Sequence, residues 1–386
     1  MTTTATVEPM LLVLLALVVY TFAGYPILIW LMARIWHSPV GRGHFLPDVA
    51  LVIVAFNEEE RIGRKLDNCL SQSYPVKCLR IVVASDGSTD STADIVRDYS
   101  DRGVTLLSFP QRRGKAACLN DAVSACLEEI LVLTDARQRL DPDAVRSLVA
   151  NFMDPTVGAA SGELVFETGD ALPYAEGMDA YWRYEKFIRR QESRFRSVIG
   201  VTGALYAMRR HDFEAIPRET ILDDVLIPMN MAMRGRRVVF DEQALAFDRP
   251  SREVSQEKSR KIRTLAGNFQ LLAMHPLLLN PVRNPVWFQL VSHKVLRLIA
   301  PYALAAVFVC SALLCRTSFA HAALFGIQVA AYGLPLIGRL CLGIGGLRVT
   351  RLAGAFVALN WFAVLGLVHY LRSQDAHLWS SDRPGK

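Results

Sequence analysis

The chain has 386 residues, of which 52% are hydrophobic and 21% are charged, and its formal net charge at pH 7 is +6. This composition is too apolar for an intrinsically disordered chain. The seven cysteines are odd in number and none stands in a CxxC pair, which excludes a disulfide scaffold. The length allows two domains, or one domain with membrane helices.

The apolar residues are concentrated at the two ends of the chain. A membrane helix needs about 20 apolar residues, and four charge-free segments come near or exceed that length: Pro9–Ala33, Leu298–Cys315, Thr317–Gly338 and Leu352–Leu371. The alternative is a set of buried core helices. No basic start or small-residue cleavage site marks the first segment as a signal peptide. We expect a transmembrane anchor over 1–36, an interfacial helix and about three transmembrane helices over 286–372, and a tail over 373–386.

Basic residues predict how the chain is oriented, because they favour the cytoplasmic side of a membrane. They flank three boundaries of the apolar segments: Arg34 and Arg42, Lys294 and Arg297, and Arg339, Arg348 and Arg351. Four spans then place the N-terminus and the C-terminal tail outside. We expect a multi-pass protein of the inner (cytoplasmic) membrane, with residues 37–285 as a cytoplasmic domain.

The middle of the chain alternates between strand-like and helix-like runs. Short β-branched runs predict four strands, at Val49–Ala55, Arg80–Ala84, Val104–Leu107 and Ile130–Thr134. Helical spacing of apolar residues lies between them, over Glu58–Ser73, Asp90–Tyr99 and Lys115–Leu127. Such alternation is typical of an α/β domain with a mostly parallel, Rossmann-like sheet and right-handed crossovers.

Polar residues follow the predicted strands where each strand ends, which is where parallel sheets bind ligands. Asn57 and Glu58 follow the first strand, Asp86 the second and Asp135 the fourth, while Lys115 opens a helix. A carboxylate can accept hydrogen bonds from a ribose or base, a lysine can bind a diphosphate, and Asp135 can hold a divalent cation. The set suits a nucleotide diphosphate. Taken singly, the same residues are equally typical of turns, helix caps and solvated helix faces.

Four ordered motifs resemble the family 2 glycosyltransferases, in particular the membrane-embedded branch that makes cellulose, chitin, hyaluronan and poly-N-acetylglucosamine. They are Val52–Glu59, Ala84–Asp90, Gly114-Lys115 with Leu119-Asn120, and Thr134–Ala136. The resemblance implies a GT-A fold, a UDP-sugar donor, Mg²⁺ or Mn²⁺, and inversion at the anomeric carbon. By motif, Phe56, Asn57, Glu58 and Asp86 would surround the uridine, Lys115 would approach the diphosphate, and Asp135 would bind nucleotide and metal.

The resemblance also assigns the acceptor side of the site. Leu222-Asp223-Asp224 matches the acidic motif whose last residue is the general base, so Asp224 takes that role. Gly203, in a small-residue turn, and Asp223, Arg260 and Arg263 would lie near the acceptor. An adjacent pair of carboxylates disfavours ionisation of both, which raises one pKa toward a value useful for a base. The bland alternative for this pair is a helix N-terminus that favours acidic residues.

The sequence departs from the family pattern at two places. The usual DxD reads Asp135-Ala136-Arg137, so a cation replaces the second carboxylate. Arg137 could itself contact phosphate. In the QxxRW motif of processive members, the Trp stacks on the acceptor sugar. Here Gln256 and Arg260 are present, but Lys261 stands where the Trp is expected, which leaves chain elongation a hypothesis.

We expect a membrane glycosyltransferase that transfers glucose or N-acetylglucosamine from a UDP-sugar to a growing β-linked polysaccharide. One alternative is a non-processive enzyme acting on a membrane lipid, and another is an impaired subunit of an export complex. The expected partners are the donor, the acceptor, the membrane and possible accessory subunits, without nucleic acid. The basic and aromatic stretch Tyr181–Arg210 is typical of an amphipathic helix near the inner leaflet or acceptor, although a solvated helix has the same pattern.

Overall fold

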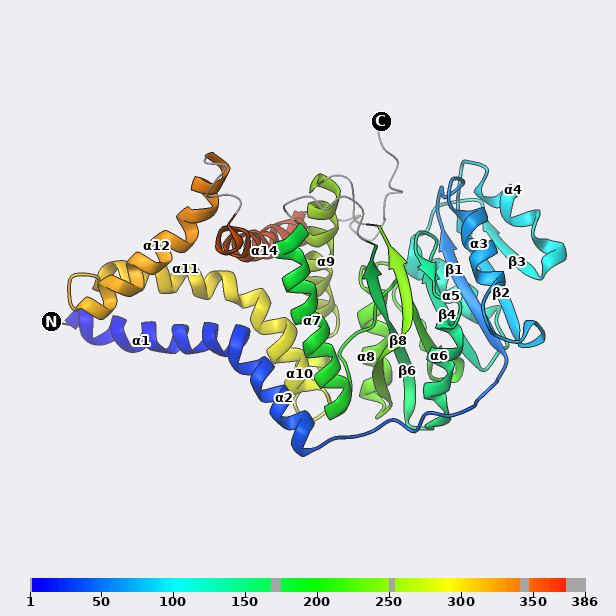
Figure 1. Ribbon diagram of the computed structural model, residues 1–386, viewed down its shortest axis with the longest axis horizontal. Helices are drawn as coiled ribbons and strands as arrows, with labels where there is room; N and C mark the ends of the chain where they lie inside the picture. Colours follow the sequence, from blue (N-terminus) through cyan, green and yellow to red (C-terminus); the bar gives the residue numbers. More distant parts are fainter. Residues whose placement is uncertain (1, 168–174, 250–253, 341–346, 373–386) are drawn as a thin grey trace.

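The computed structural model describes residues 2–167, 175–249, 254–340 and 347–372. Within these residues an eight-stranded sheet has the order β3-β2-β1-β4-β7-β6-β8-β5 (Figure 1). Its strands are β1 Val49–Ala55, β2 Leu79–Asp86, β3 Val104–Phe109, β4 Ile130–Asp135, β5 Arg139–Leu140, β6 Val157–Phe166, β7 Tyr206–Arg209 and β8 Arg237–Asp248. The four strands predicted from the sequence are all present.

The sheet is mixed but mostly parallel. Strands β3, β2, β1 and β4 are parallel neighbours, which confirms the predicted Rossmann-like half. Strand β7 then pairs antiparallel with both β4 and β6, whereas β6 and β8 are parallel. The short β5 pairs antiparallel with β8. The carboxyl ends of β1, β2 and β4 therefore meet at one edge of the sheet.

Helices cover both faces of the sheet, and this explains the continuous apolar run of β1. Val49, Leu51 and Ile53 belong to one hydrophobic core, while Ala50 and Val52 belong to the other. The first core includes residues of α3 and α6, and the second includes residues of α5 and α8. The helix bounds are α3 Ile62–Leu70, α4 Thr92–Arg97, α5 Lys115–Ser124, α6 Ala144–Ala150 and α8 Asp223–Met233. Short 3-10 helices lie at Val76–Cys78, Ser100–Arg102, Asn151–Met153, Arg210–Asp212 and Pro276–Leu279.

Two predicted helices begin later than expected, because polar side chains tie their first residues into turns. The predicted helix Glu58–Ser73 starts at Ile62, since the backbone N–H of Glu58 donates to Thr92 Oγ1 at 2.8 Å. The helix expected from Asp90 starts at Thr92, where Asp90 Oδ1 accepts the backbone N–H of Thr92 at 3.0 Å. Asp90 thus closes an Asx turn immediately before Ser91, the N-cap residue of α4.

Four helices of the described part are long and apolar enough to cross a membrane: Thr6–Ile35, Trp287–Leu314, Phe319–Gly338 and Arg348–Arg372. The first combines α1 Thr2–Val19, a π-helical turn at Tyr20–Gly24, and α2 Tyr25–Ile35. The second combines α10 Trp287–Leu290, a π-helical turn at Val291–Val295, and α11 Leu296–Leu314. The others are α12 Phe319–Leu340 and α14 Arg348–Arg372. All four coincide with the predicted apolar segments, and the predicted tail 373–386 lies outside the described residues.

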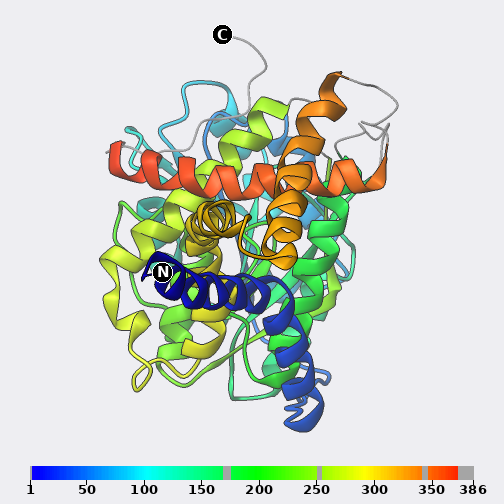
Figure 2. The ribbon, with the colours of Figure 1, turned by 90° about the vertical axis from the view of Figure 1, so that its left-hand side faces the viewer.

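The long apolar helices do not run in one direction. Helices α1 and α11 extend side by side away from the sheet domain (Figure 1), and Leu11 of α1 is buried with Val307, Cys310 and Leu314 of α11. Helix α14 instead crosses α11 at a steep angle near the sheet domain: Figure 1 shows α14 nearly end-on, and Figure 2 shows it lengthwise. There it packs against α9 Val254–Met274, a helix of the sheet domain.

A buried polar network joins the candidate membrane helices to the sheet domain through α7 Ala175–Phe195. Tyr25 of α2 donates its hydroxyl to Glu192 Oε1 at 2.6 Å, and the same oxygen lies 2.8 Å from His293 Nδ1. His293 Nε2 lies 3.0 Å from Glu185 Oε2, and Arg297 pairs with Glu185 as well. Because buried charges are costly unless paired, this network holds the two parts in one arrangement.

Candidate active site

Five residues predicted for the site meet at the carboxyl edge of the sheet. Lys115 Nζ lies 3.1 Å from Asp135 Oδ1 and 3.3 Å from Asp223 Oδ2. A Cβ atom built on Gly203 would be 3.7 Å from both Asp224 Oδ2 and Lys115 Nζ, and 3.9 Å from Asp135 Oδ2. The structure thus brings together three carboxylates and one ammonium around a glycine without a side chain, which leaves room for a ligand.

Local structure explains why these residues converge. Asp135 is the last residue of β4, Lys115 opens α5, and Asp223 and Asp224 form the first turn of α8. The buried Lys65 of α3 supports the end of β4: its Nζ donates to Thr134 Oγ1 at 2.8 Å and to the carbonyl of Gln138 at 2.7 Å. Sequence reasoning missed Lys65, although a lysine within the apolar face of a helix is a signal worth following.

The electrostatics favour a firmly protonated Lys115 and raise the proton affinity of Asp224. Burial by itself would lower the pKa of Lys115, but Asp135, Asp223 and Asp224 around it raise that pKa well above its usual value. Burial, followed by the charge of Asp223, raises the pKa of Asp224 to about 6, although Lys115 and Lys294 act in the opposite direction. A carboxyl with this pKa is largely ionised at neutral pH and is a better proton acceptor than an ordinary aspartate.

Asp86 is fully buried and organises the loop before Lys115. Its carboxylate accepts the backbone N–H of Arg113 at 2.7 Å and that of Gly114 at 3.0 Å, and the thiol of Cys118 lies 3.2 Å away. Gly87, which follows, has φ +65°, and a Cβ there would come within 2.6 Å of the backbone N of Arg112. The predicted direct contact of Asp86 with the nucleotide stays a prediction.

The segment after β1 is held against the loop after β2. Asn57 has φ 54°, and its Oδ1 accepts the backbone N–H of Thr89 at 2.8 Å. The guanidinium of Arg112 lies over the ring of Phe56, 4.1 Å from its centroid. Burial raises the pKa of Glu58, whose carboxylate is 3.1 Å from Arg61. These residues border the edge where Asp135 and Lys115 lie, and their contact with a nucleotide stays a prediction.

Helix α9 presents its cations differently from the family pattern. Burial lowers the pKa of Arg263, and the charges of Asp223 and Asp224 oppose that effect, so this guanidinium is near enough to the acidic cluster to interact with its charge. Lys261 is turned toward α7 instead, where its Nζ lies 4.7 Å from the ring centroid of Trp182 and 5.3 Å from that of Tyr181. An aromatic ring therefore does lie beside this turn of α9, but it comes from another helix.

The departure from the DxD pattern also has a structural counterpart. Arg137 Nη2 lies 2.5 Å from Asp248 Oδ2, and Gln138 Nε2 donates to the same oxygen at 3.0 Å. The guanidinium that replaces the second DxD carboxylate is thus held by a buried aspartate of β8. Among the described residues, no group of three or more His, Cys, Asp or Glu residues is placed to hold a metal ion. A cation at this site would rest on Asp135 and on oxygens of its ligand.

Lys294 is a second residue that sequence reasoning did not place in the site. It lies on the π-helical turn before α11, and its charge lowers the pKa of Asp224. In the sequence, Lys294 is only a basic residue next to an apolar segment, which predicts membrane orientation and nothing about the base.

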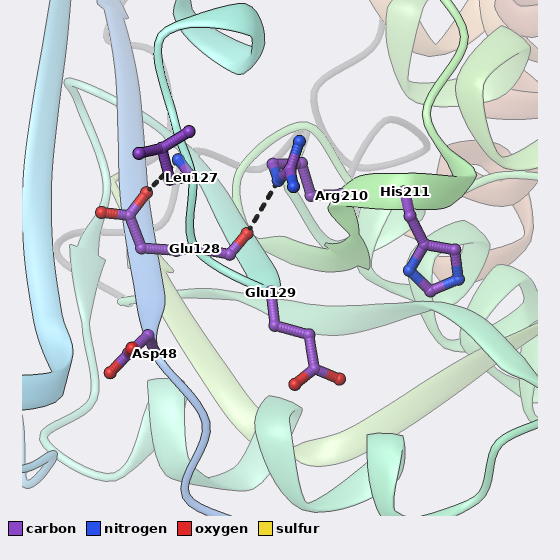
Figure 3. A pocket seen from close by; sticks show the side chains of 6 residues that line it. All are labelled: Asp48, Leu127, Glu128, Glu129, Arg210 and His211. Atoms are coloured by element: carbon purple, nitrogen blue, oxygen red, sulfur yellow. Dashed lines mark hydrogen bonds between the residues drawn. The ribbon is translucent and has the colours of Figure 1, made fainter.

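A surface pocket lies at the opposite edge of the sheet and contains none of the predicted site residues. It is lined by Asp48, Leu127, Glu128, Glu129, Arg210 and His211 (Figure 3). Arg210 Nε donates to the carbonyl of Glu128 at 3.1 Å, and Glu129 pairs with Arg209 at 3.0 Å. This pocket borders the amino ends of β1 and β4, away from the edge where parallel strands bind ligands.

Comparisons with known proteins agree with the geometry. The family model "Glycosyl transferase family 2" matches residues 50–216. A poly-beta-1,6-N-acetyl-D-glucosamine synthase of Staphylococcus aureus (strain COL) is 22% identical over 232 residues, which are 59% of this chain and 56% of that protein. The same synthase of Staphylococcus epidermidis is 20% identical over 229 residues, 58% of this chain and 55% of that protein. The chain spans about half the length of these curated relatives.

A solved structure matches nearly the whole chain. It is a mannosyltransferase from Pyrobaculum calidifontis in complex with GDP-Man and Mn²⁺, 25% identical, with a TM-score of 0.71. The match covers 95% of this chain and 99% of that chain. The family match includes Asp86, Lys115, Asp135 and Gly203, and the structural match extends over the surrounding helices. The chain therefore has the GT-A glycosyltransferase fold, and its residues 50–216 are similar to the family 2 glycosyltransferases.

Proposed function

We propose that the protein transfers a hexose, with inversion, from a nucleoside diphosphate sugar to a hydroxyl group of an acceptor held at the membrane. The arrangement of Lys115, Asp135 and Asp224 around Gly203 carries this proposal. Each group has a task in such a transfer: a cation for the diphosphate, a carboxylate for a metal, and a base for the acceptor.

The donor we propose is a UDP-sugar, with glucose or N-acetylglucosamine as the sugar. The curated relatives are named as synthases of an N-acetylglucosamine polymer, which supports the second sugar. The solved mannosyltransferase was captured with GDP-Man, which makes GDP-mannose the second donor to test. Phe56, Asn57, Glu58 and Asp86 border the proposed nucleoside pocket.

The site fits a divalent cation, Mg²⁺ or Mn²⁺, held by Asp135 and by the donor diphosphate. Asp135 keeps 41% of its side chain exposed although it pairs with Lys115, and Mg²⁺ is commonly bound by one or two carboxylates, substrate phosphates and water. The solved mannosyltransferase contains Mn²⁺. When bound, the cation neutralises charge on the leaving diphosphate.

Each of these residues of the protein would then have one task in the transfer. Asp224 accepts the proton of the acceptor hydroxyl while the hydroxyl oxygen attacks the anomeric carbon, and the bond from that carbon to the nucleoside diphosphate breaks on the opposite face. Lys115 binds the diphosphate from the other side of the sugar, and Arg263, which interacts with the charge of the acidic cluster, adds positive charge. Gly203 leaves the space between base and lysine open for the sugar. Placed acid–base catalysis of this kind contributes about 10²–10⁴-fold.

For the acceptor, we propose a membrane lipid or lipid-linked sugar. Helices α1 and α11 pack directly on each other through Leu11, Val307, Cys310 and Leu314, and α14 lies crosswise, so the described helices form no wide bundle that surrounds a polymer. The absence of the α9 tryptophan supports a single transfer. A growing β-linked polysaccharide is the second candidate, because the curated relatives are polymer synthases.

We propose the inner membrane as the location, with the sheet domain in the cytoplasm and the N-terminus outside. The expected fourth span needs revision in this proposal. Helix α14 crosses α11 near the sheet domain and packs on α9, so we place it in the plane of the membrane (Figure 2). The C-terminus would then be cytoplasmic. A C-terminal reporter that fluoresces only in the cytoplasm would be bright, whereas periplasmic alkaline phosphatase activity at that end would contradict this placement.

One experiment tests the function. Purified protein in lipid nanodiscs is given UDP-glucose, UDP-N-acetylglucosamine or GDP-mannose with Mn²⁺ and a membrane lipid extract, and nucleotide release and product size are measured. We expect release with one donor and a product in the lipid fraction, which Asp224→Asn abolishes. A long polysaccharide would favour the second candidate. Absence of release from any donor would favour an impaired export subunit over an enzyme.

A further inference from the structure

We propose that α14 positions the catalytic base: it bears on α9 at Gly366, and α9 in turn supports the turn that carries Asp224. The proposal rests on the proposed function, because it takes Asp224 as the base. Nothing in the motifs of the family 2 domain involves α14, which begins more than a hundred residues after the end of the matched region, 50–216.

The first of these contacts, between α14 and α9, lies between two helix backbones. A Cβ atom on Gly366 of α14 would be 2.7 Å from Leu265 Cβ, 3.1 Å from the backbone N of Ala266 and 3.2 Å from the carbonyl carbon of Leu265. The 2.7 Å contact is shorter than real Cβ atoms show, and the other two are tighter than most. All three opposing atoms are backbone or Cβ atoms of α9, which cannot turn away as the end of a flexible side chain can. Only glycine therefore lets α14 approach α9 this closely, as at other close helix crossings with small residues.

The second contact lies one helical turn or less further along α9, on its other side. A Cβ on Gly267 would be 2.6 Å from Leu222 Cγ and 2.9 Å from Ile221 Cγ2. The side chain of Gln270 adds two hydrogen bonds, since its Oε1 accepts the backbone N–H of Ile221 at 2.9 Å and its Nε2 donates to the carbonyl of Glu219 at 2.8 Å. Helix α9 thus fixes the segment 219–222 both sterically and by hydrogen bonds.

The base follows this segment directly. Leu222 precedes Asp223 and Asp224, the first two residues of α8. Leu222 and Ile221 are buried in the core, so they cannot yield freely when α9 moves. Helix α9 also carries Arg263, which interacts with the charge of the same carboxylates. A shift of α9 therefore changes both the base and a neighbouring cation, and a misplacement of about 1 Å can cost about 10² in rate.

Two glycines of the same helix allow a matched test. Gly366→Ala introduces the short contacts described above, whereas at Gly354 a Cβ would meet only Pro335 Cβ at 3.7 Å, an ordinary van der Waals distance. Both substitutions raise helix propensity equally. In nanodiscs, we expect Gly366→Ala to lower kcat at least tenfold with the donor KM changed less than threefold, since the proposed nucleotide pocket lies at β1 and β2. Gly354→Ala should keep kcat within twofold.

A double-mutant cycle separates positioning from general damage to the fold. If α14 acts through the base, Asp224→Asn in the Gly366→Ala background costs much less than in the wild type, because part of the contribution of the base is already lost. If the kcat of the double variant fell by the product of the two single effects, the proposal would be overturned. A Gly366→Ala protein as active as Gly354→Ala would overturn it as well. Should Gly366→Ala not fold, Gln270→Met takes its place in the double-mutant cycle, because a methionine of similar length removes both hydrogen bonds of Gln270. Full activity of Asp224→Asn alone would instead refute the proposed function.

Discussion

Asp224→Asn should produce a protein that is less active and more stable at neutral pH. The amide cannot accept the acceptor proton, so we expect kcat to fall by about 10²–10⁴. The same change removes a negative charge from a site that disfavours it, because burial and Asp223 raise the pKa of Asp224 from 3.8 to about 6. Catalysis and stability should therefore respond in opposite directions to one substitution.

The size of the stability gain follows from the pKa. A carboxyl pKa that rises from 3.8 to about 6 corresponds to about 3 kcal/mol between its two protonation states. Because the side chain of Asp224 is only partly buried, solvent screens its charge, and we expect about 1–2 kcal/mol in practice. The folded-state pKa lies above the unfolded one, so the wild type loses stability as the pH rises from about 4 to about 6. The gain from Asn is therefore present above pH 6 and vanishes below pH 4.

Two assays in nanodiscs test this reasoning. Nucleotide release gives kcat against pH, and the wild type should lose activity below about pH 6 as Asp224 is protonated. Thermal unfolding at pH 7.5 and pH 4 gives the stability difference, with Asp101→Asn, an exposed carboxylate between α4 and β3, as the control. A melting temperature of Asp224→Asn below that of the wild type at pH 7.5 would refute the electrostatic argument. If Asp224→Asn were as active as the wild type, Asp224 would have no part in the mechanism.

Three further predictions follow from the same site. Gly203→Val should lower kcat/KM at least about tenfold while Gly203→Ala costs less, because the Cβ position is already 3.7 Å from Asp224 and Lys115; steady-state kinetics of both variants would show it. Removal of divalent cations with EDTA should abolish nucleotide release and added Mn²⁺ should restore it, so undiminished release with EDTA would argue against the metal role of Asp135. Lys65→Met should lower the free energy of unfolding by about 1–2 kcal/mol, since Thr134 and the carbonyl of Gln138 lose a buried charged donor; unchanged denaturation midpoints would contradict this.

The parallel half of the sheet was predictable because burial on both faces is the dominant constraint on the residues of its central strands. Strands β1 and β4 are covered on both faces, so they must be continuously apolar, and that pattern marks them in the sequence. The antiparallel β7 has only four residues, Tyr206–Arg209, and its pattern Tyr-Ala-Met-Arg predicts no partner. Its pairing with β4 and β6 depends on residues far away in the sequence, which local periodicity does not encode.

The site was predictable where one strand end or one helix start places a residue. Asp135 and Lys115 belong to that class, and their ion pair follows from the order of the strands. Lys294 and Lys65 belong to another class, because each lies on a helix far in the sequence from the residues that it influences, and only the packing of those helices brings them together. The same holds for Asp248, whose contact with Arg137 joins the end of β8 to the turn after β4, more than a hundred residues away in the sequence.

The contact between Lys261 and Trp182 shows that an aromatic ring can lie beside this turn of α9 although the tryptophan of the motif is absent. In the family pattern the aromatic ring follows the arginine on the same helix, whereas here the lysine at that position packs on a tryptophan of α7. A cation over an aromatic face is worth about 0.5–2 kcal/mol, so the pair also contributes to holding α7 against α9. The turn of α9 that would carry a stacking ring is thus occupied by an interhelical contact. A sugar that stacked on Trp182 would have to compete with Lys261 for the ring, which is a physical reason to expect an acceptor bound for one transfer rather than a chain that slides through the site.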